Sequence, residues 1–265
     1  MKVGYFIDLH QFSILLNGVY LDIQMKSKTR ILSVINNKII IMRKISVIAL
    51  AAAGLFLTSC GDKSKTASTA TEQQVAEKKG DVFAVDAATS TVNWKAFHKG
   101  GFAPRWGTLA ITSGELSLAD GQLSSGEFVI DMKSIKVDPA SVTEKDKKYT
   151  ELETHLKSAD FFNVEKNPTA EFKITKVSDL AAGAEGAVAG ANKTVSGNLT
   201  LQGKTLNVTF PAKVDTADKK VSLLAKFTVN RTDWGIKFGT TESDPAEWMI
   251  SKDIEIGIDV KANQK

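Results

Sequence analysis

Short runs of alternating apolar and polar residues recur along the chain from about residue 82 to its C-terminal end. The clearest run is 254–260, in which Ile or Val occupies every second position and Glu, Gly or Asp the positions between. A period of two is typical of an antiparallel strand with one buried and one solvated face. Seven further segments complete a prediction of eight strands: 92–98, 106–118, 127–132, 171–175, 193–201, 206–214 and 221–229.

The segments between these strands contain turn residues and one helical pattern. Asp120-Gly121 and the Gln-Gly-Lys sequence at 202–204 fit hairpin connections. The stretch 181–190 consists mainly of Ala and Gly and has no bulky side chain, which indicates an exposed loop. Within 144–158, residues 149, 152 and 156 are Tyr, Leu and Leu at helical spacing, which predicts one helix.

Eight such strands can form either a sandwich or a closed barrel. Closure removes the exposed edges that attract other strands. The interior of an eight-stranded barrel is either filled by its own side chains or wide enough to hold one small ligand. The alternation of residues does not choose between these architectures.

A different pattern precedes the strands. Residues 42–44 are Met-Arg-Lys, 45–57 carry no charge, and small residues lead to Cys60. The apolar stretch is shorter than the roughly 20 residues that a spanning helix needs. We therefore predict a lipoprotein signal peptide over 42–59, with Cys60 as the lipidation site. The alternative is a short buried helix with an incidental cysteine.

The flanking segments complete the predicted organisation. Residues 1–41 mix apolar and basic residues without a clear period, and we expect them to be a non-native extension, with Met42 as the true start. If 1–41 is real, it is a candidate membrane anchor. Residues 60–80 are rich in Lys, Ser, Thr, Ala, Glu and Gln and predict a flexible tether. The barrel domain is assigned to 81–265.

Charge and composition exclude several functions. Seven of the 34 basic and two of the 30 acidic residues precede Cys60, which leaves 27 basic and 28 acidic residues after it. The part of the chain after Cys60 is therefore nearly neutral and lacks the excess of basic residues typical of nucleic-acid binding. Cys60 is the single cysteine and only His98 and His155 follow it, so we expect no metal site. No nucleophile elbow or phosphate loop occurs, and we predict no catalytic residues and no enzyme activity.

Four segments in the second half resemble one known family. They are the HLKSADFFNV sequence at 155–164, NPTAEF at 167–172, VSGNLTLQGK at 195–204 and NRTDWGI at 230–236. In this order they are similar to the YceI-like family of polyisoprenoid-binding, lipocalin-like barrels, over about 82–262. The sequence departs from the family pattern at Lys204 and Leu206, and the Ala/Gly loop looks inserted.

The resemblance implies a fold and a function. The fold is all-β: an extended eight-stranded antiparallel lipocalin-like barrel with one flanking helix. The function is to carry or sequester a long apolar lipid, isoprenoid- or quinone-like, without a cofactor. With Cys60 acylated, we expect a lipid-anchored protein of the cell envelope, periplasmic or on the surface, with the outer membrane favoured. The alternative is a ligand-free scaffold barrel, and a homodimer is left open.

Strand parity selects the side chains that would face a ligand. The predicted lumen contacts are Trp94, His98, Phe128, Ile130, Met132, Phe172, Ile174, Leu199, Leu201, Phe210, Phe227 and Val229. A solid core that binds nothing is the alternative, since small barrels are often filled. His98 could bond a headgroup or serve a purely structural role. Arg231 and Asp233 are expected to form a salt bridge that fixes a turn.

Overall fold

A computed structural model describes residues 66–184, 188–241, 245 and 248–265. The predicted extension at 1–41, the signal peptide at 42–59 and the lipidation site Cys60 lie outside these residues. Within the described ranges, no helix is long and apolar enough to cross a membrane.

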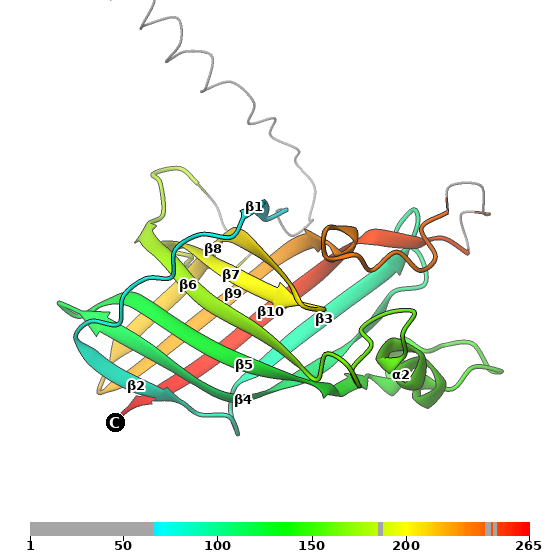
Figure 1. The fold of residues 1–265 in the computed structure, drawn as a ribbon, viewed down its shortest axis with the longest axis horizontal. Helices are drawn as coiled ribbons and strands as arrows, with labels where there is room; N and C mark the ends of the chain where they lie inside the picture. The colour runs from blue at the N-terminus through cyan, green and yellow to red at the C-terminus, as the bar shows by residue number, and fades with distance from the viewer. Residues whose placement is uncertain (1–65, 185–187, 242–244, 246–247) are drawn as a thin grey trace, which may run out of the picture. The chain divides into compact units, whose positions relative to one another are not determined.

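Eight antiparallel strands form a closed barrel (Figure 1). They are β3 (Thr91–His98), β4 (Arg105–Ala119), β5 (Gln122–Val137), β6 (Thr169–Asp179), β7 (Lys193–Leu201), β8 (Lys204–Ala217), β9 (Lys220–Asn230) and β10 (Ile250–Gln264). Each strand pairs with the next, and β10 pairs with both β9 and β3, which closes the barrel. The one α-helix of the described residues, α2 (Tyr149–Lys157), packs against β5. The predicted fold class is confirmed.

A short strand, β2 (Asp81–Val85), lies ahead of β3 in the same position of the barrel wall. Both strands pair with β4 on one side and β10 on the other: β2 meets residues 115–118 of β4, and β3 meets 105–110. The two are therefore one strand interrupted by a turn at residues 86–90. The hydroxyl of Ser90 exchanges hydrogen bonds with the backbone of Lys261 and ties this turn to β10.

The barrel interior contains a continuous aromatic stack. The rings of Phe128 and Phe172 lie 5.2 Å apart, those of Phe172 and Phe210 lie 5.8 Å apart, and those of Phe210 and Phe227 lie 4.1 Å apart. All four side chains are buried. Such offset and tilted ring pairs are favourable beyond the burial of their area. This part of the barrel is therefore a solid core.

Residues 66–80, which we call the strap, cross the outer surface of the barrel (Figure 1). The strap contains β1 (Ser68–Thr71), which pairs with residues 206–209 of β8. The prediction of a flexible tether is wrong for this part of 60–80. β1 is held through its main chain, and its four side chains are all exposed, so its polar composition gave no sign of this pairing.

Candidate ligand-binding site

An apolar cavity of about 120 Å³ lies inside the barrel. Its lining comes from seven strands, α2 and the loops at the α2 end, and nearly all of it is aliphatic or aromatic. Six of the predicted lumen residues line this cavity: Trp94, Ile130, Met132, Leu199, Leu201 and Val229. Strand parity therefore located half of the predicted set at a real cavity.

A second cavity of about 300 Å³, which we call the vestibule, lies between β3, the start of β4 and α2. The vestibule shares five lining residues with the lumen cavity: Trp94, Ala96, Leu156, Phe161 and Ile250. The two cavities are thus neighbours separated by single side chains. The vestibule differs in chemistry, since Lys147, Lys148 and Glu151 contribute charged groups to it. The vestibule is thus a partly charged hollow beside an almost wholly apolar one.

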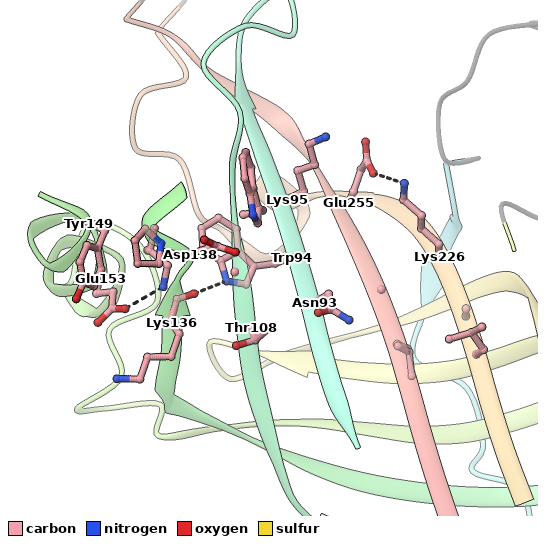
Figure 2. Close-up of a pocket in the computed structure, with 18 of the residues that line it drawn as sticks. Asn93, Trp94, Lys95, Thr108, Lys136, Asp138, Tyr149, Glu153, Lys226 and Glu255 are labelled. Carbon is pink, nitrogen blue, oxygen red and sulfur yellow. Dashed lines mark hydrogen bonds and ion pairs between the residues drawn. The ribbon is translucent and has the colours of Figure 1, made fainter. Parts of the chain in front are cut away.

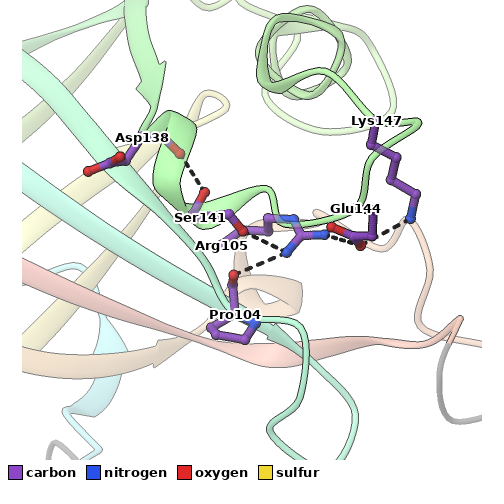
Figure 3. Close-up of polar contacts among 6 residues, drawn as sticks. All are labelled: Pro104, Arg105, Asp138, Ser141, Glu144 and Lys147. Carbon is purple, nitrogen blue, oxygen red and sulfur yellow. Dashed lines mark hydrogen bonds and ion pairs between the residues drawn. The ribbon is translucent and has the colours of Figure 1, made fainter.

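The vestibule wall is fixed by a network around Arg105 (Figure 3). The guanidinium of Arg105 donates to the backbone oxygen of Ser141 at 2.8 Å and to the carboxylate of Glu144 at 2.5 Å. Lys147 lies 3.4 Å from the same carboxylate. Burial raises the pKa of Glu144, but hydrogen bonds from its own backbone N–H and from Arg105 outweigh this and bring the pKa to about 2. The network pins the 139–147 segment to β4.

The helix α2 forms the opposite wall and is anchored at its middle and near its end. At its middle, the Glu153 carboxylate accepts a hydrogen bond from the backbone N–H of Val137 at 2.9 Å. Near its end, the His155 ring lies 3.0 Å from Asp160 and packs edge-on against Phe161 and Phe238. His155 thus fixes the geometry of the entrance.

Arg231 is the most unusual buried residue of the site. It is 2 % exposed and lines the lumen cavity. Its guanidinium donates to four backbone carbonyls, those of Ile236, Phe238, Ile250 and Ser251, at 2.8–3.2 Å. Burial lowers its pKa. The expected salt bridge to Asp233 is wrong: the charge holds together the loop after β9 and the start of β10.

Two tryptophans each combine an apolar ring at the lumen with a polar anchor. Trp94 donates from Nε1 to the backbone oxygen of Lys136 at 3.2 Å, and Trp234 donates from Nε1 to that of Leu199 at 3.1 Å. Trp234 belongs to the 3-10 helix η2 (Arg231–Trp234), which follows β9. Because each indole N–H has a partner, both rings can face an apolar ligand without an unsatisfied donor.

The other predicted lumen residues lie elsewhere. Phe128, Phe172, Ile174, Phe210 and Phe227 face inward but belong to the packed core and do not line the cavity. His98 lies at the vestibule, stacked on Phe102 at 5.9 Å, and its buried Nδ1 has no hydrogen-bond partner among the described residues. Ligand contact by all twelve predicted lumen residues stays a prediction.

Sequence reasoning missed several lining residues. Ala96 has the same parity as Trp94, which could have identified it. Phe161, Arg231 and Trp234 lie in loops and 3-10 turns, where no period signals which way a side chain faces.

A larger hollow, of about 970 Å³, lies on the outer barrel surface (Figure 2). Outward side chains of several strands form it, including Asn93, Lys95 and Thr108, and Lys226 lies 3.0 Å from Glu255 across it. Its walls are open and mix charged side chains with apolar ones, so it lacks the enclosed apolar lining of the lumen cavity. Metal binding has no comparable candidate, since the described ranges contain no group of three or more His, Cys, Asp or Glu side chains placed to hold an ion.

Comparison with known proteins assigns the class of this fold. The model of the YceI-like domain matches residues 83–262, so the chain belongs to the YceI-like family. A UPF0312 protein of Serratia proteamaculans is 34% identical over 146 residues, which are 51% of this chain and 68% of that protein. A UPF0312 protein of Pseudomonas aeruginosa is 39% identical over 93 residues, 34% of this chain, and the match spans only 44% of that relative's length.

A solved structure is similar as well. It is described as a polyisoprenoid binding domain from Saccharophagus degradans implicated in plant cell wall breakdown. It is 16% identical, covers 72% of this chain and 100% of its own, and has a TM-score of 0.47.

Proposed function

We propose that this protein binds an amphiphilic lipid, with the apolar tail in the barrel lumen and the polar headgroup at the vestibule. The observation that carries the proposal is the adjacency of the two cavities. A vestibule whose apolar lining includes several charged side chains and an apolar cavity share Trp94, Ala96, Leu156, Phe161 and Ile250. Ligand sites are typically apolar with a few placed polar groups, and this arrangement matches a molecule with one apolar and one polar end.

The size of the lumen sets how the ligand would fit. A cavity of about 150 Å³ holds one benzene ring, so 120 Å³ accommodates about one five-carbon isoprene unit. A longer tail must displace side chains. Met132 lines the cavity and is flexible, whereas the Phe128–Phe172–Phe210–Phe227 stack resists displacement. We therefore propose that the tail enlarges the cavity on binding, starting at Met132.

The ligand class and location extend the proposal. The family resemblance favours an isoprenoid- or quinone-like tail and a binding protein rather than an enzyme. The predicted signal peptide over 42–59, followed by Cys60, favours an acylated protein of the cell envelope, where such lipids occur. Two or more acyl chains at Cys60 would give stable anchoring to a membrane, with the outer membrane favoured. A homodimer stays a prediction.

One substitution tests the binding proposal. Ala96 lies at the junction of the two cavities, so Ala96→Trp should fill the passage between them. Ala110→Trp is the matched control, since Ala110 is exposed on the neighbouring strand β4 and lines neither cavity. The assays are mass spectrometry of an apolar extract of the purified protein and uptake of a fluorescent isoprenoid alcohol.

We expect lipid in the wild type and in Ala110→Trp, and little in folded Ala96→Trp. Absence of lipid and of uptake in all three proteins would overturn the binding proposal and favour the scaffold alternative. Equal uptake by folded Ala96→Trp would place the ligand outside these cavities.

A further inference from the structure

The wall of the barrel contains a window between β8 and β9. These strands pair only through residues 212–217 of β8 and 220–225 of β9. Beyond this pairing β9 continues to Asn230 along β10, while the start of β8 stays with β7. The two strands therefore separate toward the α2 end. The 3-10 helix η2, which follows β9 and contacts β8, bounds the window at that end.

The first part of the strap, residues 66–71, fills this window. β1 pairs with β8 through four residue pairs, from Ser68–Thr209 to Thr71–Leu206. On the other side, Thr66 forms a parallel bridge to Thr228 of β9, and the N–H of Ala67 donates to the Thr228 oxygen at 2.8 Å. Adjacent strands lie about 4.8 Å apart, so a wall that admits one extra strand opens by about 10 Å. That width admits a hydrocarbon chain.

The window leads to the proposed ligand site. Val229 and Trp234 both line the lumen cavity, and they lie at the end of β9 and in η2, where the window is bounded. The side chain of Ala67 is 6 % exposed and packs with the barrel core. Ala67 is the buried apolar residue of β1 and its flank, and its small side chain is the strap's main apolar contact with the interior here.

Most of the remaining contacts of the strap are hydrogen bonds, and Lys78 adds exposed ion pairs with Glu115 at 2.5 Å and Glu127 at 3.6 Å. The amide of Asn198 accepts from the Gln73 N–H at 3.0 Å and donates to the Gln73 oxygen at 2.7 Å. Asn207 donates to Asn198 at 3.0 Å and orients it. Both asparagines are outward-facing yet only 3 % and 5 % exposed. Farther along, the Ala76 N–H donates to the Ile174 oxygen at 3.0 Å.

Because the strap makes few buried apolar contacts, it can detach while the barrel stays folded. All four β1 side chains are exposed, whereas the strands it crosses bury the core. Segments with few buried apolar contacts and exposed hydrogen bonds open at lower free energy than the whole fold. The barrel keeps its own closure through the 212–217 to 220–225 pairing when the strap leaves.

We infer that the strap can detach from the barrel, and that its release opens a lateral entrance between β8 and β9 through which a lipid tail reaches the lumen. We call this entrance the side door. This inference rests on the proposed lipid-binding function. A lateral entrance spares a long tail the passage end-on through the vestibule, where Arg105 and Glu144 fix the wall.

A reversible cross-link tests the door. Ser68→Cys with Thr209→Cys places two thiols at directly opposed positions of β1 and β8. The matched control is Thr200→Cys with Thr205→Cys, opposed on β7 and β8, which never involves the strap. Both are made in the full chain with Cys60→Ser, so that the new pair supplies the only thiols. Each protein is measured oxidised and reduced with cis-parinaric acid, a fluorescent 18-carbon polyene, as the probe.

Closing the disulfide in the Ser68/Thr209 pair should slow probe uptake and release by about tenfold or more, because the strap can no longer open locally. The amount bound at equilibrium should not change, and the control pair should show equal rates in both states. Asn198→Ala, which removes the paired bonds to Gln73, should speed uptake severalfold and increase hydrogen exchange in the strap.

The outcomes separate the two hypotheses. Full binding at equal rates in the oxidised and reduced Ser68/Thr209 pair would overturn the side door and leave the binding proposal standing. Absence of probe binding in every form would overturn the binding proposal, and the side door with it.

Discussion

Replacement of Arg231 by methionine tests whether a buried charge holds the entrance end of the barrel together. Methionine approximates the length of the arginine stem but removes the guanidinium, whose donors satisfy the backbone carbonyls of Ile236, Phe238, Ile250 and Ser251. The substitution therefore leaves four carbonyl groups without these donors, in a region where Arg231 is only 2 % exposed.

The expected loss of unfolding free energy is the difference between the lost hydrogen bonds and the avoided cost of burying a charge. A typical hydrogen bond contributes about 1 kcal/mol net, so four bonds suggest about 4 kcal/mol. Burying the charge costs part of this, as the lowered pKa of Arg231 indicates, and methionine avoids that cost. We expect the free energy of unfolding to fall by about 3 kcal/mol, a large part of the roughly 5–15 kcal/mol of a typical domain.

Urea unfolding followed by tryptophan fluorescence measures this loss for the variant and the wild type. Lys213→Met is the control, because the exposed pair of Lys213 and Asp215, 3.0 Å apart, should contribute at most about 1 kcal/mol. Hydrogen exchange at the Ile250 N–H, which donates to the Gly239 oxygen at 2.9 Å, should accelerate in Arg231→Met. A stability within about 0.5 kcal/mol of the wild type would refute the reasoning and show that the four bonds merely balance the desolvation cost.

Two further predictions concern packing and pH. Gly197→Ala would place a methyl group 2.2 Å from the Phe172 ring and should cost about 1–3 kcal/mol by overpacking, whereas Gly257→Ala, with its nearest neighbour at 3.3 Å, should cost much less; thermal unfolding compares them. The pKa of Glu144 in the folded protein, about 2, lies below the unfolded value of about 4.3, so its contribution is complete above the unfolded value and is lost as the pH falls toward 2. Between pH 5 and pH 2 the wild type should therefore lose about 1 kcal/mol more unfolding free energy than Glu144→Gln, and equal losses would argue against the Arg105 network.

The strands and their inward faces could be predicted from the sequence because the alternation of apolar and polar residues is a local property of each strand. The run at 254–260 lies in β10, and its Ile and Val residues face the interior as predicted. The helix was also predicted, but α2 begins at Tyr149, later than the expected 144, because the segment before it is pinned to Arg105. The resemblance, not the periodicity, selected a barrel over a sandwich.

The alternation of apolar and polar residues could not predict which part of the interior is a cavity and which is a solid core. Phe172 and Leu199 are both predicted lumen residues and lie opposite each other on β6 and β7, yet only Leu199 lines the cavity. Which inward side chain meets an empty volume depends on how rings from several strands stack, as Phe172 does between Phe128 and Phe210. No local sequence property encodes that packing.

The sequence by itself determined the strands, their polarity and the family, because alternation and short motifs are local properties of the chain. Only the tertiary structure decided that the strap is ordered, that Arg231 bonds to carbonyls rather than to Asp233, and where the lumen is empty. The physical reason is common to all three: each depends on partners distant in sequence. The residue types of a segment do not reveal which main-chain hydrogen bonds it forms or where packing leaves an empty cavity.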